Sequence, residues 1–462
     1  MSNNLRVTEA LVEHIVSTNL QKLPKEVIAF TKDVLLDFIS CAIGGTKAQG
    51  CYELIKFIRI MKSSGKSTVI GYGDRVAAPL AALANGVMGH ALDFDDTHDK
   101  AVLHTSVCTA PAALALAEYE EVDGKTLIEA LAVGMDIQCR LGLACKHGFA
   151  KYGWIYTAIM GVFGAAVAAS KILDLDFEKT RNAIGIAYSL SSGNAEALIE
   201  GTLCKRMQPG FASENGVRAS LLARHGIDGP REVLEGRYGF YNVYLRGEWE
   251  PSRILDELGE RYEVLNLSLK PYPSCRYTHS SIDAMIEFRK MGLRPNDVDR
   301  IEIGLNRAAK SIVGEPEDLK YRPRTIVDAQ FSIPYTASCA FINGEVNIED
   351  FKEKAIKRKE ILDFARRIKL KVDEEIERED PRGFTIKARL KTKDGKTYDK
   401  MVKFPKGSPQ NPMSLEDLKR KLVTCSNNSV IKMSEERLKE IIDITTRLER
   451  VNDIRRLTEL LI

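Results

Sequence analysis

The feature that most constrains the fold of this chain is a set of three segments rich in small residues. They read APLAALANGVMGHAL (78–92), TAPAALALAEYE (109–120) and TAIMGVFGAAVAASKIL (157–173). Ala and Gly let helix backbones approach closely, so helices of this kind are packed on all sides rather than facing water. Together with helical periodicity at 8–23 and 24–45, they predict a helical core that continues to about residue 240.

The pattern changes after about residue 262, where apolar residues begin to alternate as in strands. The alternating segments are EVLNLSLKPYP (263–273), DRIEIGL (299–305) and IKLKVDEEIE (368–377), with a helical stretch at 279–292. The segment 384–404 predicts a hairpin that turns at Asp394-Gly395. Helical periodicity returns after Pro405.

This order predicts a mostly α protein in which a large all-helical domain is interrupted by an α+β domain. We expect the N-terminal part of the helical domain at 1–264, the α+β domain at 265–405, and C-terminal helices returning to the helical domain at 406–462. A chain of 462 residues is long enough to bury two such cores.

Charge and cysteine usage narrow the class of protein. The 67 Lys and Arg nearly balance the 64 Asp and Glu, which gives no reason to expect nucleic acid or a membrane surface as partner. The nine cysteines are scattered without a C-x-x-C pair, as expected of buried reduced thiols. The first residues lack a signal-peptide pattern. We therefore expect a cytoplasmic location.

One segment is unusually polar. GHALDFDDTHDKAVLHTSV (89–107) follows a small-residue helix and holds three histidines and four aspartates. Three interpretations stay open on composition alone: a divalent-metal site, since Asp and His bind metals; general acid–base catalysis, since His beside carboxylates transfers protons near neutral pH; and an ordinary helix end with polar loop residues. No strict metal signature such as H-E-x-x-H is present.

Two further segments add positive charge. GTLCKRMQPG carries Lys205 and Arg206, and LKPYPSCRYTH carries Lys270 and Arg276. Each of these side chains taken alone is typical of a solvated loop, but together they predict a pocket that binds a di- or tricarboxylate through charge-assisted hydrogen bonds. Tyr335, in DAQFSIPYTASCAF, is either a core tyrosine with a bonded hydroxyl or part of this pocket.

At GHALDFDDTH the sequence resembles the MmgE/PrpD family, which includes 2-methylcitrate dehydratase, cis-aconitate decarboxylase and iminodisuccinate epimerase. GVFGAAVAASKILDLD, GTLCKRM, KPYPSCRYTH and DAQFSIPY resemble family segments in the same order, so the similarity covers essentially the whole chain. The resemblance implies an all-helical domain made from both chain ends, an inserted α+β lid domain and a homodimer. It also implies catalysis without a metal or other cofactor.

The family's catalytic positions map onto residues of this sequence. The resemblance makes Asp93, His104, Lys205 and Tyr335 catalytic, and Thr97 and Lys270 substrate-binding; we add Arg206 and Arg276 as substrate-binding cations. Two positions depart from the family pattern, because Ile155 and Gln208 stand where many members have His.

Reactions of this family begin at a C–H or C–COO⁻ bond beside a carboxylate, and the negative charge that develops needs nearby cations. We hypothesise that His104 transfers the proton, that Asp93 orients it, and that Tyr335 donates to a departing hydroxyl or a carboxylate. The expected reaction is dehydration of a 2-methylcitrate-like polycarboxylate. An epimerase, a decarboxylase and a catalytically silent binding homologue remain alternatives.

Overall fold

The computed structural model describes residues 6–148 and 151–462. These residues form two compact units. The helical unit runs up to Ala91, from Asp95 to Leu267 and from Leu415 to Ile462, and the α+β unit comprises Leu92–Phe94 and Ser268–Ser414. Both ends of the described chain therefore belong to one unit, and the mostly α architecture expected from the sequence is confirmed. The lid role expected of the α+β unit stays a prediction.

The helical unit is built almost entirely from helices. Its longer helices are α1 (Val7–Ser17), α2 (Lys25–Gly45), α3 (Cys51–Ile60), α4 (Ala78–His90), α5 (Ser106–Tyr119), α6 (Gly124–Leu143), α7 (Tyr156–Ile172), α8 (Phe177–Ser189), α10 (Cys204–Arg224), α20 (Leu415–Asn427) and α21 (Glu435–Thr446). Its short elements are α9 (Glu196–Ile199), α11 (Phe240–Leu245), α12 (Ser252–Leu255), α22 (Arg455–Thr458), β1 (Ser67–Thr68), β2 (Arg75–Val76) and β3 (Thr97–His98).

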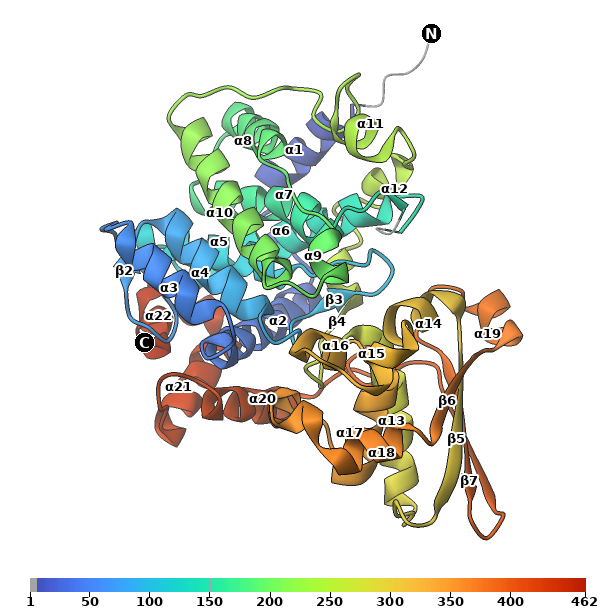
Figure 1. The fold of residues 1–462 in the computed structure, drawn as a ribbon. Coiled ribbons are helices and arrows are strands. Elements are labelled where there is room, and N and C mark those ends of the chain that lie inside the picture. The colour runs from blue at the N-terminus through green and yellow to red at the C-terminus, as the bar shows by residue number, and fades with distance from the viewer. Residues whose placement is uncertain (1–5, 149–150) are drawn as a thin grey trace. The chain divides into compact units, whose positions relative to one another are not determined.

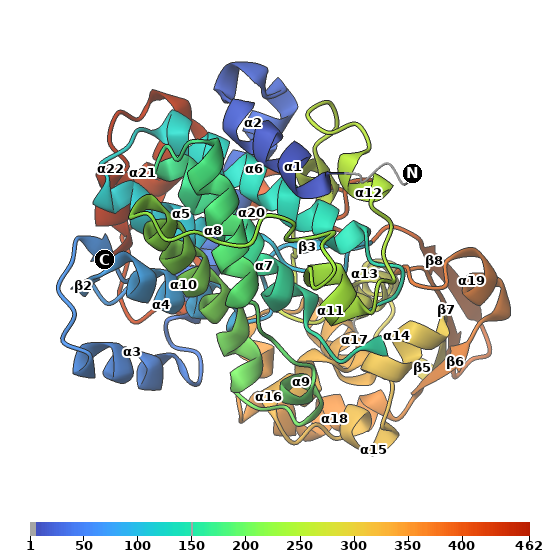
Figure 2. The same ribbon diagram turned by 90° about the horizontal axis from the view of Figure 1, so that it is seen from above.

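The small-residue segments form the central helices of this unit, as predicted. Figure 2 shows α7 surrounded by neighbouring helices, and it packs against α5, α6, α8 and α10. Close approach requires glycine where α4 crosses α10: a Cβ on Gly86 would lie 2.9 Å from the Cα of Gly210. Small residues thus let these helices cross at short distance, and the close packing buries the helices that carry them.

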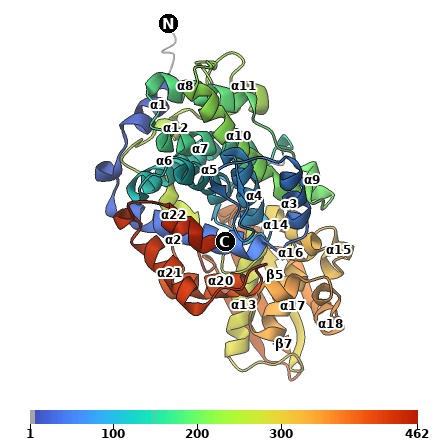
Figure 3. The ribbon, with the colours of Figure 1, turned by 90° about the vertical axis from the view of Figure 1, so that its left-hand side faces the viewer.

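The C-terminal helices pack on the N-terminal ones. α20 and α21 lie against α2, as the red and dark-blue ribbons in Figures 1 and 3 show. Farther along, the buried carboxylate of Glu118 accepts hydrogen bonds from the Thr68 hydroxyl (2.6 Å) and the Thr458 hydroxyl (2.8 Å). These contacts tie the last residues of the chain to α5.

The α+β unit combines one sheet with several helices. The helices are α13 (His279–Lys290), α14 (Arg307–Val313), α15 (Glu317–Tyr321), α16 (Ile326–Gln330), α17 (Ile333–Asn343), α18 (Lys359–Ala365) and α19 (Glu374–Glu379). The sheet has the order β6 (Ile368–Val372), β5 (Val298–Leu305), β7 (Ile386–Thr392) and β8 (Thr397–Val402). β5 is parallel to β6 and antiparallel to β7. Strand β4 (Leu267–Ser268) lies at the boundary of the two units.

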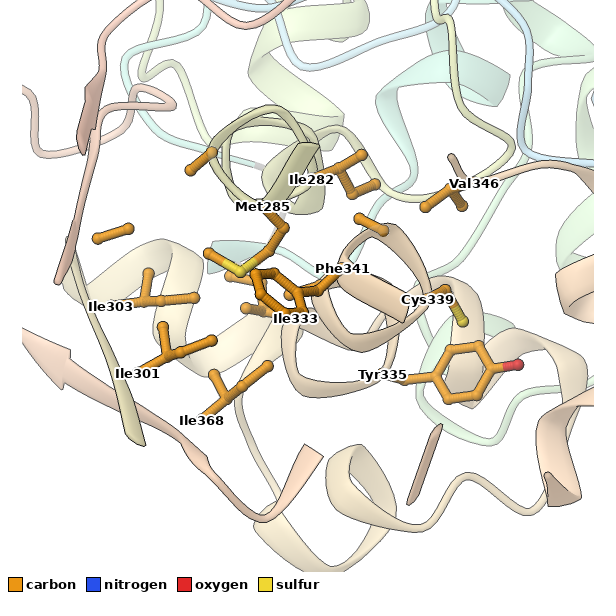
Figure 4. Close-up of a cluster of buried hydrophobic side chains, with 14 of the residues drawn as sticks. Ile282, Met285, Ile301, Ile303, Ile333, Tyr335, Cys339, Phe341, Val346 and Ile368 are labelled. Carbon is orange, nitrogen blue, oxygen red and sulfur yellow. The ribbon is translucent and has the colours of Figure 1, made fainter. Parts of the chain in front are cut away.

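One face of this sheet and two helices enclose the core of the α+β unit. Figure 4 shows Ile301, Ile303 and Ile368 from the sheet packed toward Met285 of α13 and Phe341 of α17. All five side chains are buried. The alternation of apolar residues along β5 and β7 directs one row of side chains into this core.

The structure confirms the predicted hairpin and shortens two predicted strands. The hairpin joins β7 to β8, with Gly395 at φ 89° in the turn. The segment 263–273 forms a 3₁₀ helix (Glu263–Asn266) and the two residues of β4 rather than a long strand. In the segment 368–377, strand β6 ends at Val372 because the next residue, Asp373, caps α19: its side chain accepts hydrogen bonds from backbone N–H groups in the first turn of that helix.

Seven of the nine cysteines are buried and all nine are free thiols, as predicted. Within residues 6–148 and 151–462, no helix is both long enough and apolar enough to cross a membrane.

Candidate active site

The polar segment after α4 is divided between the two units. α4 ends at His90, Leu92–Phe94 belong to the α+β unit, and the chain re-enters the helical unit at Asp95. Asp93 has a positive φ of 54°, a left-handed conformation that Asp and Asn adopt more readily than most residues. The segment therefore supplies side chains to both units.

In the helical unit, Asp96 anchors the start of α5. Its carboxylate accepts hydrogen bonds from the backbone N–H groups of Thr105 and Ser106, each at 3.1 Å, and from both of their hydroxyls. These N–H groups lie at the helix N-terminus, where a carboxylate satisfies otherwise unpaired donors and interacts favourably with the helix dipole. Asp96 thus positions His104, which lies two residues before the helix.

The His104 ring is held in one tautomer. Its Nδ1 lies 2.6 Å from the Asp96 carbonyl oxygen and 3.0 Å from Oδ2 of Asp95. A carbonyl oxygen only accepts hydrogen bonds, so Nδ1 carries the proton and Nε2 has the free lone pair. The His104 backbone is fixed as well, because its N–H donates to Thr157 Oγ1 (3.1 Å) and its carbonyl accepts from Gln138 Nε2 (2.9 Å).

Asp95 serves two histidines at once. Its Oδ2 also lies 2.9 Å from Nδ1 of His90. Burial by itself raises the pKa of the Asp95 carboxyl, but the charges and hydrogen bonds of His90 and His104 outweigh burial and hold that pKa well below its usual value. Burial lowers the pKa of His90 to about 4, although Asp95 acts in the opposite direction. At neutral pH the network is an Asp95 carboxylate that accepts from two imidazole N–H groups.

His90, Asp95 and His104 lie close enough together to invite the metal interpretation. The contacts fit a proton network better. Both Nδ1 atoms face the same carboxylate oxygen at hydrogen-bond distances of 2.9 and 3.0 Å, and the Asp96 carbonyl requires a proton on one of them. The His104 side chain is 21% exposed whereas that of His90 is 3% exposed, so His104 is the member that can meet a substrate.

The remaining predicted residues of the helical unit lie on α10 and β3. Lys205 is in the first turn of α10, and its charge is among the causes that lower the pKa of His90, after burial. The Arg206 guanidinium is buried and donates to the Gln49 carbonyl oxygen at 2.9 Å. The Thr97 hydroxyl donates to the Leu103 carbonyl oxygen at 3.3 Å. Lys205 is thus the predicted cation whose charge reaches the histidine network.

In the α+β unit, the structure pairs two predicted residues. The buried Lys270 ammonium donates to Oδ1 of Asp93 at 2.6 Å and to the Asp93 carbonyl oxygen at 3.0 Å. Asp93 thus forms a buried ion pair with Lys270. In the helical unit, the Asp95 carboxylate lies 3.0 Å from the His104 ring. The orienting role that sequence reasoning gave to Asp93 stays a prediction.

Arg276 lies among structural contacts of the same unit. Its guanidinium donates to the Lys406 carbonyl oxygen (2.9 Å) and the Ser408 hydroxyl (2.6 Å), and to Nδ1 of His279 at 3.2 Å. His279 is buried, and burial together with the Arg276 charge holds its pKa well below the usual value. The substrate-binding role predicted for Arg276 stays a prediction.

Tyr335 lies in the core of the α+β unit. The side chain is 1% exposed, and its hydroxyl donates to the Asp350 carbonyl oxygen at 2.5 Å. Figure 4 shows the ring beside Cys339. Burial raises the pKa of this phenol. The geometry is what the core interpretation of Tyr335 expects, and a catalytic role would need this hydrogen bond to break.

The two departures from the family pattern both lie in the helical unit. Ile155 precedes the first turn of α7. Gln208 is buried on α10, where its amide accepts from the Asn194 N–H (3.2 Å) and donates to the Asn194 carbonyl oxygen (2.9 Å). Pro209 and Gly210 lie inside α10. Neither position supplies a titratable imidazole.

Sequence reasoning found the segment but missed some of its roles. Asp95 and His90 were visible in the polar segment, although nothing in the spacing shows that one carboxylate serves two rings. Gln138 and Thr157, which fix the His104 backbone, come from α6 and α7 and carry no signal in the sequence. In this network, Nε2 of His104 can act as a general base, or as a general acid once it is protonated.

Two family models and several known proteins are similar to this chain. The MmgE/PrpD N-terminal domain matches residues 9–252, and the MmgE/PrpD C-terminal domain matches residues 272–447. The chain is 28% identical to a cis-aconitate decarboxylase of Aspergillus terreus, over 95% of this chain and 92% of that protein. It is 27% identical to cis-aconitate decarboxylase of Mus musculus (98% and 93%) and 28% identical to that of Homo sapiens (98% and 94%).

The two family models together span nearly the whole chain. They match in the order in which the helical and α+β segments follow one another, and the first of them contains the His90–Asp95–His104 network. The protein belongs to the MmgE/PrpD family.

Proposed function

We propose that this protein is a metal-independent lyase of small di- or tricarboxylates in which His104 transfers the proton. The observation that carries the proposal is the fixed tautomer of His104, whose Nδ1 faces Asp96 and Asp95 while Nε2 is left for substrate. The 28% identity to enzymes named cis-aconitate decarboxylase over nearly the whole chain supports a lyase.

Decarboxylation is the reaction that the network supports best. When the C–COO⁻ bond of cis-aconitate breaks, CO₂ leaves and the electron pair moves through the neighbouring double bond. The far alkene carbon then takes one proton and itaconate forms. A single imidazolium at His104 supplies that proton, and the charge of Lys205 stabilises the anion that develops.

Dehydration of a 2-methylcitrate-like hydroxy acid is the second candidate. It requires removal of a proton beside a carboxylate and delivery of a proton to the departing hydroxyl. The neutral Nε2 of His104 suits the first step. The second step would fall to another donor, and the Tyr335 hydroxyl is bonded to the Asp350 carbonyl oxygen. Decarboxylation therefore requires fewer catalytic groups than dehydration, because it transfers one proton and does not require the Tyr335 hydrogen bond to break.

The test is proton NMR of the purified protein in D₂O with cis-aconitate, 2-methylcitrate, citrate, malate, tartrate and aspartate-like diacids. We expect itaconate signals from cis-aconitate. New vinylic signals from a hydroxy acid would replace decarboxylation by dehydration, and deuterium entering an α position without a new compound would indicate epimerisation. No change with any acid would overturn the proposal for this substrate class.

A further inference from the structure

A single charged residue interrupts the buried part of α2. Residues 34–45 are all buried, and Asp37 is the one ionisable acid or base among them apart from the Cys41 thiol. Its Oδ1 accepts a hydrogen bond at 2.6 Å from the ammonium of Lys421, which lies on α20, 384 residues away in sequence. The two side chains are 0% and 2% exposed.

Stability alone is a poor explanation for this pair. Removing two charges from water costs several kcal/mol per ion, and apolar replacements of buried ion pairs are often neutral or stabilising. Burial raises the pKa of the Asp37 carboxyl to about 6, even beside Lys421. Burial also opposes the charge on Lys421, but Asp37 raises the pKa of that ammonium above its usual value. Lys421 thus keeps the Asp37 carboxylate ionised at neutral pH, and Asp37 in turn favours the charged form of Lys421.

The pair lies next to the histidine network. α2 packs on α4, which ends at His90, and the Phe38 ring lies so close to Gly89 that a Cβ there would be 2.7 Å from it. The charge of Asp37 interacts with the carboxylates of Asp96 and Asp95. Of the two members of the pair, Asp37 is therefore the one whose charge acts on the histidine network.

We propose that Asp37, kept ionised by Lys421, is a positioning residue that sets the proton affinity of the His90–Asp95–His104 network. The Asp37 carboxylate adds negative electrostatic potential at the two imidazoles, so it favours their protonated forms. This inference rests on the proposed function only in giving His104 the proton-transfer role.

Other titratable groups face the same region, and their charges also contribute to the electrostatic potential at the histidine network. They are the thiols of Cys41, Cys108, Cys139 and Cys425, the carboxyls of Asp96, Asp136 and Glu263, and the cations Lys205 and Arg140. Burial raises the pKa of all four thiols, so they stay neutral at working pH. The Asp37–Lys421 pair can be neutralised without touching a contact of His104 given above.

Three variants separate charge from structure. Asp37→Asn removes the carboxylate charge and retains the positive charge of Lys421, so the His104 titration midpoint should move down by about one pH unit. Lys421→Met leaves Asp37 without its partner, so Asp37 takes up a proton, and the midpoint should fall by less. The double variant Asp37→Asn/Lys421→Met removes both charges and should match Lys421→Met.

The midpoint is read from the ¹³Cε1–¹H signals of labelled histidine, assigned to His104 by their loss in His104→Gln. This measurement needs no substrate, so it stands even if the proposed reaction fails. Where turnover is found, the pH midpoint of kcat should shift in the same direction and order, whether His104 acts as acid or base.

Glu118→Gln is the matched control. Glu118 is also a buried, ion-paired carboxylate, and it lies 12 residues beyond Ser106, about 18 Å along α5. It should lower thermal stability without moving the His104 midpoint. If a single variant does not fold, the double variant decides the question. An unchanged midpoint in folded Asp37→Asn, or in the folded double variant, would overturn the proposal.

Discussion

At the residue scale, the chemistry of the helical unit depends on where one ring proton lies. The Asp96 carbonyl and the Asp95 carboxylate both face Nδ1 of His104, and His90 is kept neutral by burial. Removing the His104 imidazole therefore removes the histidine of this network that is partly exposed and has a fixed orientation.

His104→Gln should lower kcat by about 10²–10⁴-fold, the usual contribution of a general acid or base. Thermal unfolding followed by circular dichroism should show the fold intact, since Gln retains hydrogen-bonding groups. The control is His225→Gln, an exposed histidine just after α10, which should keep wild-type kinetics. Near-normal kcat in His104→Gln would exclude this residue from the mechanism.

Asp93 allows charge to be separated from backbone conformation. Asp93→Asn keeps a residue that tolerates the left-handed backbone but removes the carboxylate charge beside the buried Lys270 ammonium. We expect reduced kcat and reduced thermal stability. Asp93→Ala should lose about 1 kcal/mol more, because Ala is strained at positive φ. Equal unfolding free energies for the two variants, from urea titrations, would contradict the backbone argument.

At the element scale, the 3₁₀ helix Glu263–Asn266 shows how a short connector is held at the end of the helical unit. The Glu263 carboxylate contacts the His98 ring (3.3 Å) and accepts from Asn266 (2.8 Å), and the Glu263 N–H donates to Asp136. Burial opposes ionisation of Glu263, but His98, Asn266 and Arg261 outweigh it and lower its pKa to about 2.

This shift makes the stability of the helical unit pH-dependent. Because the native pKa of Glu263 is below the ordinary value of 4.5, the ionised form stabilises the fold above about pH 4.5, and this stabilisation is lost as pH falls toward 2. Glu263→Gln should therefore lower the free energy of unfolding at pH 7 by about 2 kcal/mol. The difference from wild type should shrink at pH 3. The exposed Glu260→Gln is the control, and a pH-independent difference would contradict the assignment.

At the scale of the whole molecule, the two units have separate cores, so they can be destabilised separately. Phe341→Ala removes a large side chain from the core shown in Figure 4 and should cost about 3–5 kcal/mol. Hydrogen exchange should then lose protection in α13, α17 and β5 while α5, α6 and α7 keep theirs. Phe404→Ala, at an exposed phenylalanine, is the control. Equal loss in both units would show that they unfold together.

The sequence by itself determined the elements whose pattern repeats locally. The small-residue helices, the hairpin at Asp394-Gly395 and the polar segment at 89–107 all follow from periodicity, turn chemistry and composition, because these depend on neighbours a few residues apart. Where the local pattern was short, as at 263–273, the chain forms a 3₁₀ helix and a two-residue strand in place of the expected long strand.

Only the tertiary structure decided the pairings that give the site its chemistry. Asp95 faces His104, the Tyr335 hydroxyl is bonded within a core, and Lys421 reaches Asp37 from 384 residues away. Proton positions and buried charges depend on which groups meet across such separations and on how much water their packing excludes. Neither quantity is encoded in the spacing of residues along the chain.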